Sequence, residues 1–146
     1  MRPARATTTY SFGNDESKLC DHANFADLTL REVAPAGWVT SDACKDQQSV
    51  TAFVGSYSAN AFRLFDMHGN VNEWTADCYV NSYDGATRDG SARQTADCKL
   101  RVARGGSWSS DPQVLRAALR SWGTPVNRGN YLGFRVGRSL LPPRTL

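Results

Sequence analysis

The sequence lacks several features that would place it in a familiar class of protein. No apolar run approaches the roughly 18 to 20 residues of a membrane-spanning helix. The start, MRPARATTTYSFGNDE, has no apolar segment of the kind found in signal peptides. The cysteines form no C-x-x-C pair, which argues against a zinc ribbon. We therefore expect no membrane span and no zinc-based fold.

What is present points to one loop-rich domain. The chain has 146 residues, with 12 Gly and 6 Pro, and it contains no internal repeat. This length is typical of a single domain that can bury a core without metal ions. We therefore predict one domain over residues 1–146.

The basic residues are unevenly placed. Residues 101–146 contain eight Arg, no Lys and a single acid, Asp111. A basic region can bind nucleic acid or another anionic partner. These arginines are dispersed singly, however, and Arg without Lys suits planar forks that bind carboxylates or backbone carbonyls within a fold. We expect structural arginines, with an anion-binding face as the alternative, and we do not expect a nucleic-acid partner.

The four cysteines leave several arrangements open. Cys20, Cys44, Cys78 and Cys98 allow three pairings, and four buried free thiols are the alternative. Sequential pairing, Cys20 with Cys44 and Cys78 with Cys98, would close two loops. We favour disulfides because the flanking sequence is loop-like, and disulfides would favour an extracellular or cell-surface location.

Short strands are predicted along the chain. Alternating or β-rich patterns indicate strands at residues 51–57, 70–80 and 100–108, with the last strand at 131–140. VLRAALRSW, residues 114–122, fits a helix and a strand equally well.

The stretch with most chemical content is DMHGNVNEW, residues 66–74. The carboxylates of Asp66 and Glu73 flank a glycine turn, with carbonyls at Gly69 and Val71. Such a set of oxygens could bind a hard cation such as Ca²⁺, although the spacing is not that of an EF-hand. A turn between two strands is the alternative.

Several blocks of sequence resemble one known family. TTTYSFGNDE, VGSYSANAFRLFDMHGNVNEWTADCY, RVARGGSW and NYLGFRVGRSL are similar, in the same order, to the formylglycine-generating enzyme, or sulfatase-modifying factor, family. The resemblance implies an irregular, loop-rich α+β variant of the C-type lectin fold, with short antiparallel strands and little helix. The family's usual N-terminal portion is missing here, and Asn72 stands where Trp is common.

The resemblance also implies calcium sites. Family enzymes bind structural Ca²⁺ at positions that match Asp66, Gly69, Val71 and Glu73. A second site would match Asn24, Phe25, Asp46 and Gln48, with carbonyl ligands from Phe25 and Gln48.

The enzyme chemistry of the family is not expected here. Its oxidases bind copper through two cysteines, and the matching positions hold Pro112 and Ala117. Its sulfoxide synthases take iron from a set of histidines, whereas this chain has only His22 and His68. We expect no copper, no iron and no catalytic residue. A Ser107 and His68 pair lacks any accompanying nucleophile motif.

A third branch of the family resembles residues 104–138, which we call the variable segment. This branch comprises the variable proteins of diversity-generating retroelements, which bind ligands through a substitution-tolerant C-terminal surface. Its variable positions match Ser109, Ser110, Val114, Leu119, Ser121, Trp122, Gly123, Thr124, Val126, Gly129 and Tyr131. The constant positions, which we call the framework, match Trp108, Leu115, Arg116, Arg120, Asn127, Arg128, Gly133 and Phe134.

The resemblance predicts a ligand-binding display protein. Except for Gly123 and Gly129, the variable positions are the expected ligand-binding residues, with Trp122 and Tyr131 supplying large contact areas. The expected partner is a protein or other macromolecule, and a second copy could cover exposed core. The alternatives are a non-catalytic or truncated family domain of other function and an oxidase relative.

Overall fold

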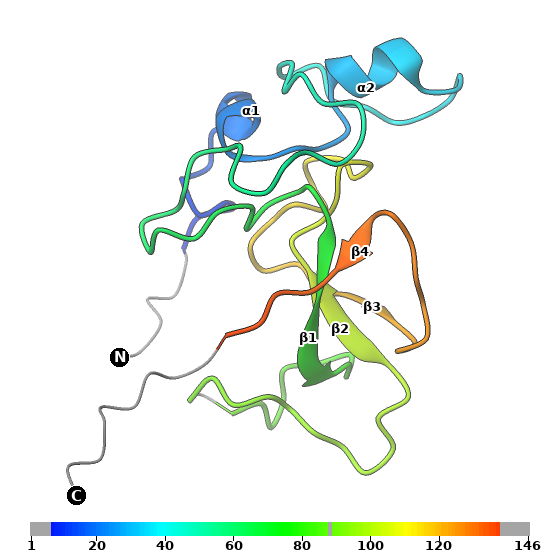
Figure 1. Cartoon of the computed structure of the whole chain (residues 1–146). Helices are drawn as coiled ribbons and strands as arrows, with labels where there is room; N and C mark the ends of the chain where they lie inside the picture. The colour runs from blue at the N-terminus through cyan, green and yellow to red at the C-terminus, as the bar shows by residue number, and fades with distance from the viewer. Residues whose placement is uncertain (1–6, 88, 138–146) are drawn as a thin grey trace, which may run out of the picture.

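The computed structural model describes residues 7–87 and 89–137 (Figure 1). Its elements are η1 (Glu16–Lys18), α1 (Leu19–His22), α2 (Leu28–Val33), β1 (Asn72–Cys78), β2 (Arg101–Arg104), β3 (Ser121–Gly123) and β4 (Leu132–Gly133). The fold is α+β and loop-rich, as expected. In Figure 1 the helices lie at one end of the molecule and the sheet lies at the other. No helix in the described part of the chain is long and apolar enough to cross a membrane.

The short helices were not predicted, although their caps are visible in the sequence. Asp27 accepts hydrogen bonds from the backbone N–H groups of Thr29 and Leu30 at the start of α2. Asp15 does the same for Ser17 at the start of η1. An Asp at this position satisfies N–H groups that have no partner within the helix. Elements of three to six residues show too little periodicity to be detected otherwise.

The sheet has the strand order β3-β2-β1-β4. β1 pairs with β2, and β2 with β3, in antiparallel orientation, with Trp74 opposite Ala103 and Val102 opposite Trp122. β4 instead pairs with β1 in parallel, which corrects the expectation of antiparallel strands alone. The predicted strands at 70–80 and 100–108 are confirmed in shorter form as β1 and β2.

Two other predictions about strands need correction, and one open alternative is resolved. Residues 51–57 form turns and irregular backbone, and the side chains of Phe53 and Val54 are 91% and 88% exposed. A β-rich composition does not make a strand where no neighbouring strand lies alongside. The predicted strand at 131–140 is reduced to Leu132–Gly133, and its residues 138–140 lie outside the described residues. The ambiguous stretch 114–122 is mostly turns and enters β3 only at Ser121.

The core connects the N-terminal part of the described chain to the variable segment. Leu115, from the variable segment, packs in one buried cluster with Tyr10, Leu19 and Phe25. The hydroxyl of Tyr10 also donates to the carbonyl of Pro112 at 3.2 Å. Turns around residue 115 are thereby held against the N-terminal segment.

Both disulfides follow the sequential pairing. Cys20 is bonded to Cys44 and Cys78 to Cys98, which confirms the favoured arrangement. The first bond lies against the buried cluster, and the second begins at the end of β1. Each closes a loop, with sequence separations of 24 and 20, and thereby restricts the unfolded chain.

His68 connects the same two parts of the chain. Its Nδ1 lies 2.8 Å from the carbonyl oxygen of Leu115, and its Nε2 lies 3.0 Å from the backbone nitrogen of Ser11. Burial lowers the pKa of His68, which favours the neutral ring. A neutral ring satisfies both contacts if Nδ1 donates to Leu115 and Nε2 accepts from Ser11. His68 is therefore a structural histidine that fixes the turn at Leu115.

Candidate functional site

The variable segment has a constrained backbone. After β2 the chain turns at Gly105 and Gly106, passes through buried Ser107 and Trp108, and follows a series of turns to β3. The guanidinium of Arg104 donates to the carbonyl oxygen of Leu119 at 3.2 Å, across these turns. This contact is a structural use of arginine, as we expected from the dispersed placement of arginines in residues 101–146.

Trp108 lies near the start of the variable segment. It is 9% exposed and packs in a buried cluster with Ala26 and Leu30. Its ring stacks on Trp38 at a centroid distance of 6.2 Å, and its Nε1–H group donates to the carbonyl oxygen of Asn130 at 3.3 Å. Trp108 thus connects the region of Trp38 to the loop that precedes β4.

Three of the predicted ligand-binding residues line one hollow. A cavity of about 380 Å³ is bounded by Trp38, Val39, Ser109, Ser110, Asp111 and Val114. The hydroxyls of Ser109 and Ser110 lie 3.2 and 3.1 Å from that of Ser107, so both serines also take part in the turn. Ser109, Ser110 and Val114 are half-buried and do not project freely into solvent.

A second group of predicted residues lies on β3 and the loop after it. Trp122 is 56% exposed, Val126 is 78% exposed and Tyr131 is 43% exposed, and Thr124 is exposed as well. The Trp122 ring packs against the ring of Tyr79 at a centroid distance of 5.6 Å, so the covered part of Trp122 contacts a second aromatic residue. Leu119 and Ser121, in contrast, are half-buried. The accessible variable surface is therefore concentrated at residues 122–131.

The framework positions are not all buried, and one variable position is not exposed. Phe134, a framework position, is 73% exposed. The framework residues Arg116, Asn127 and Arg128 are exposed as well. Gly123, expected to vary, is buried, and an added Cβ would lie 2.8 Å from the Asn127 amide nitrogen and 3.0 Å from the Trp74 ring. Position 123 therefore tolerates only glycine without local rearrangement.

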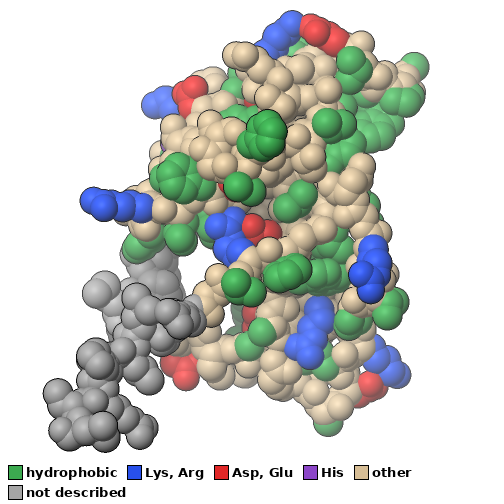
Figure 2. Space-filling view, viewed as in Figure 1, with side chains coloured by type: hydrophobic (Ala, Val, Ile, Leu, Met, Phe, Trp, Pro, Cys, Tyr) green, Lys and Arg blue, Asp and Glu red, His purple; other side chains and the backbone are tan. Residues whose placement is uncertain are grey.

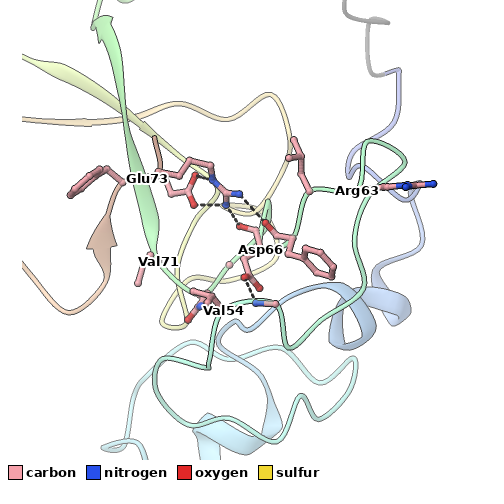
Figure 3. Close-up of a pocket in the computed structure, with 12 residues that line it drawn as sticks. Val54, Arg63, Asp66, Val71 and Glu73 are labelled. Atoms are coloured by element: carbon pink, nitrogen blue, oxygen red, sulfur yellow. Dashed lines mark hydrogen bonds and ion pairs between the residues drawn. The ribbon is translucent and has the colours of Figure 1, made fainter. Parts of the chain in front are cut away.

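The first predicted calcium set lines a cavity of about 510 Å³ (Figure 3). The structure brings Asp66, Gly69, Val71 and Glu73 to this cavity. The guanidinium of Arg135, however, forms an ion pair with Glu73 and donates to the carbonyl oxygen of Asp66 at 3.0 Å.

Arg135 therefore supplies a cation within the first set. Hydrogen bonding to Glu73 raises the pKa of Arg135. One oxygen of Asp66 accepts the N–H group of Gly55 at 2.7 Å, whereas Oδ1 is buried without a hydrogen-bond partner among the described residues. Ca²⁺ could use this oxygen, but it would have to displace the guanidinium from Glu73 to gain both carboxylates.

At the second predicted calcium set, no Arg or Lys among the described residues forms an ion pair with the carboxylate. Asp46 accepts hydrogen bonds from the backbone N–H groups of Phe25, at 2.9 Å, and Gln48, at 2.7 Å, so the structure brings these residues together beside Asn24. Burial raises the pKa of Asp46 to about 6, and the neighbouring Asp27 carboxylate adds to the effect. The Oδ1 atom of Asn24 is fully buried without a partner among the described residues. A buried oxygen without a partner and a buried carboxylate are both groups that an oxygen-liganded cation can use.

Exposed apolar side chains lie near the first set. Val54 and Phe134 line the same cavity, and both are largely exposed. Phe53, Phe62 and Val136 are also at least 72% exposed, and hydrophobic side chains are spread over the face drawn in Figure 2. The sequence did not predict the exposure at residues 53, 54, 134 and 136, because these residues lie in segments that were expected to form strands.

The positions of the family's catalytic cysteines lie in the turns before β3. Pro112 is buried and Ala117 is exposed. In the described part of the chain, no group of three or more His, Cys, Asp or Glu residues is arranged to hold a metal ion. The side chains of Pro112 and Ala117 are apolar and lack a nucleophilic or ligating atom.

The short-stranded, loop-rich α+β architecture and the motifs at residues 66–74 and 104–108 define a sulfatase-modifying type of domain. Residues 2–140 match the family model described as the sulfatase-modifying factor enzyme 1-like domain, and the chain belongs to this family.

Named relatives include an enzyme and an inactive protein. The chain is 32% identical to the formylglycine-generating enzyme of Mus musculus over 95 residues, which cover 63% of this chain and 25% of that protein. It is 36% identical to the inactive C-alpha-formylglycine-generating enzyme 2 of Bos taurus over 81 residues, which cover 52% of this chain and 22% of that protein. The chain thus spans a quarter or less of the length of these relatives.

Two solved structures share the fold. PvdO from Pseudomonas aeruginosa superposes with a TM-score of 0.68 at 36% identity, over 86% of this chain and 43% of that one. Variable protein 1 of Treponema denticola superposes with a TM-score of 0.64 at 24% identity, over 87% of this chain and 39% of that one. The second similarity shows the fold alone.

We predict that the two tryptophans of the variable segment differ sharply in their contribution to stability. Trp108→Ala removes a buried ring and should lower the free energy of unfolding by about 3 to 5 kcal/mol. Trp122→Ala removes a half-exposed ring and should cost about 1 kcal/mol or less. Thermal or denaturant unfolding of both variants measures the difference. Equal losses would place Trp122 in the core and contradict its assignment to a contact surface.

Proposed function

We propose that this chain is a non-catalytic ligand-binding protein of the variable-protein type encoded with diversity-generating retroelements. The observation that carries the proposal is the contrast within one segment: Trp108 and Leu115 are buried, whereas Trp122, Val126 and Tyr131 are accessible on β3 and the following loop. Buried framework residues hold the backbone while the exposed side chains can change. Tyr and Trp give large contact areas at low cost in side-chain entropy.

The ligand in this proposal is a protein or another macromolecule. The hollow at Ser109, Ser110 and Val114 and the surface at residues 122–131 flank Trp108, so one large partner could contact both. The two disulfides support an extracellular or cell-surface location, because such bonds persist in oxidising compartments. The exposed apolar side chains of Phe53 and Phe134 support a second interface, with another copy of the chain as the proposed partner.

The proposal is tested with libraries on a display system. In one library Trp122, Thr124, Val126 and Tyr131 are randomised; in the control, Ser107, Trp108, Leu115 and Gly123 are randomised. Most clones of the first library should be displayed at the parental level because these side chains lie on the surface. Selection against a test protein such as lysozyme should then yield binders from the first library alone. A first library that loses display as severely as the control would contradict the proposal.

We further propose that the chain has no formylglycine-generating activity, because Pro112 and Ala117 cannot supply the thiolates that bind Cu(I) in the family's oxidases. Incubation with copper, oxygen and a sulfatase-derived cysteine peptide should leave the peptide unchanged in mass. A heat-inactivated sample serves as the control. Conversion of the peptide above this control would refute the proposal and favour an oxidase relative.

We also propose that Ca²⁺ stabilises the fold. Asn24, Phe25, Asp46 and Gln48 supply the better supported set of oxygens; Asp66, Gly69, Val71 and Glu73 supply a second set in competition with Arg135. Bound Ca²⁺ would neutralise the buried carboxylate and fix the loop at residues 46–48. Its role would be structural and not catalytic.

Calcium removal should destabilise the protein. A ligand at a hundredfold excess over its Kd adds about 2.7 kcal/mol, which corresponds to roughly 5 to 10 °C in Tm for a domain of this size. Chelation should lower the Tm of the parent protein by this amount, Asp46→Asn should abolish most of the shift, and Glu73→Gln should have the smaller effect. An unchanged Tm in chelator, with no metal by elemental analysis, would contradict calcium binding.

A further inference from the structure

Three arginine side chains line a small cavity beside the variable segment. The space has a volume of about 60 Å³ and is bordered by Arg93, Arg104 and Arg120, together with Asp77 at the end of β1 and Tyr83 in the loop that follows it. This is the volume of about two water molecules in the liquid. A carboxylate, phosphate or sulfate group is of similar size.

The charge in this cavity is only partly balanced by the protein, because one carboxylate, Asp77, lines it with three arginines. In the residues that the structure describes, no carboxylate forms an ion pair with Arg93, Arg104 or Arg120. The Asp77 carboxylate accepts the backbone N–H group of Arg93 at 2.9 Å and the hydroxyl of Thr75 at 3.2 Å. A recess whose charged lining has an excess of positive groups attracts anions and raises their local concentration.

The guanidinium groups are held in place by neutral partners. Arg104 donates to the hydroxyl of Tyr83 at 3.2 Å, and Arg93 donates to the carbonyl of Ser82 at 3.1 Å. Arg120 lies 4.0 Å from the centre of the Tyr83 ring and donates to the carbonyl of Val80 at 3.0 Å. Each guanidinium has five N–H donors, so the described contacts leave donors for a ligand. Forks that are already positioned lose less entropy on binding an oxyanion.

Side-chain contacts connect the cavity to the accessible part of the variable segment. Arg120 lies 5.4 Å from the centre of the Tyr79 ring, and the Tyr79 ring packs against Trp122 at 5.6 Å. A row of aromatic rings and one guanidinium thus leads from the cavity to Trp122. A ligand could contact Trp122 with an apolar group while it places an acidic group among the arginines.

We infer that the cavity lined by Arg93, Arg104 and Arg120 binds an oxyanion group of the ligand, a carboxylate, phosphate or sulfate. The inference rests on the proposed function only in assigning this group to the ligand of the variable segment. The oxyanion site itself follows from the arginine arrangement. It specifies one chemical requirement of the ligand: an acidic group within reach of an apolar contact at Trp122.

The site is tested with small anions on the intact chain. Sodium acetate, phosphate and sulfate are titrated separately, against sodium chloride at equal ionic strength, and the arginine side-chain N–H signals are followed by NMR. Signals of the three arginines should shift saturably with at least one oxyanion. Arg93→Gln and Arg120→Gln should each weaken binding by about fivefold or more. Arg128→Gln, which removes the same charge from the exposed loop, should leave the affinity unchanged.

The outcomes separate this inference from the proposed function. Thermal unfolding confirms that each variant is folded, and the two substitutions in the cavity test the site independently of each other. Shifts that do not saturate, or that are equal in the parent, Arg93→Gln and Arg120→Gln proteins, would overturn the inference. Trp122→Ala should leave acetate, phosphate or sulfate binding intact, because Trp122 does not line the cavity. If the library yields binders but the titrations show no anion site, only the inference is refuted. If the titrations show an anion site but the library yields no binders, only the display function is refuted.

Discussion

Much of this structure depends on the close approach of backbone at Gly69. This residue has a φ of 72°, and an added Cβ would lie 2.0 Å from the carbonyl oxygen of Asn24. Its N–H group donates to the carbonyl of Gly105 at 2.8 Å, and the N–H group of Asn70 donates to Asn24 at 2.8 Å. Residues 69–70 are therefore enclosed between the N-terminal segment and the start of the variable segment. Any side chain at position 69 would push these segments apart.

Hydrogen bonds from loop to loop replace much of the secondary structure that other folds use. The backbone N–H group of Trp108 donates to Asn70 at 2.9 Å, and that of Ala117 donates to Thr9 at 2.8 Å. Together with the buried ring of His68, these bonds fix the turns of the variable segment without a helix or a long strand. A backbone held in this way can expose Trp122 and Val126 without needing them for its own stability.

Sequence reasoning succeeded where the local pattern coincided with the tertiary environment. The alternation around Trp74 predicted β1, and the loop-like flanks of the cysteines favoured the disulfides that the structure contains. It failed for Phe53 and Phe134, because an aromatic side chain shows its hydrophobicity in the sequence but not what covers it. It also missed the cavity at Arg93 and Arg120, which long-range packing brings together. Nothing in the spacing of these arginines could have shown that they meet.

Arginine is used in two distinct ways in this domain. At Glu73, Arg135 neutralises a carboxylate inside the fold and occupies space that a bound cation would need. At Tyr83, Arg104 and Arg120 are held by neutral groups, so their charges have no acidic partner among the described residues. In the first arrangement the charge of the arginine is neutralised by Glu73. In the second arrangement the proposed partner of the arginine charges is an anionic group of the ligand. The dispersed arginines of the C-terminal part therefore include both structural groups and groups positioned for a ligand, two uses that the sequence left as alternatives.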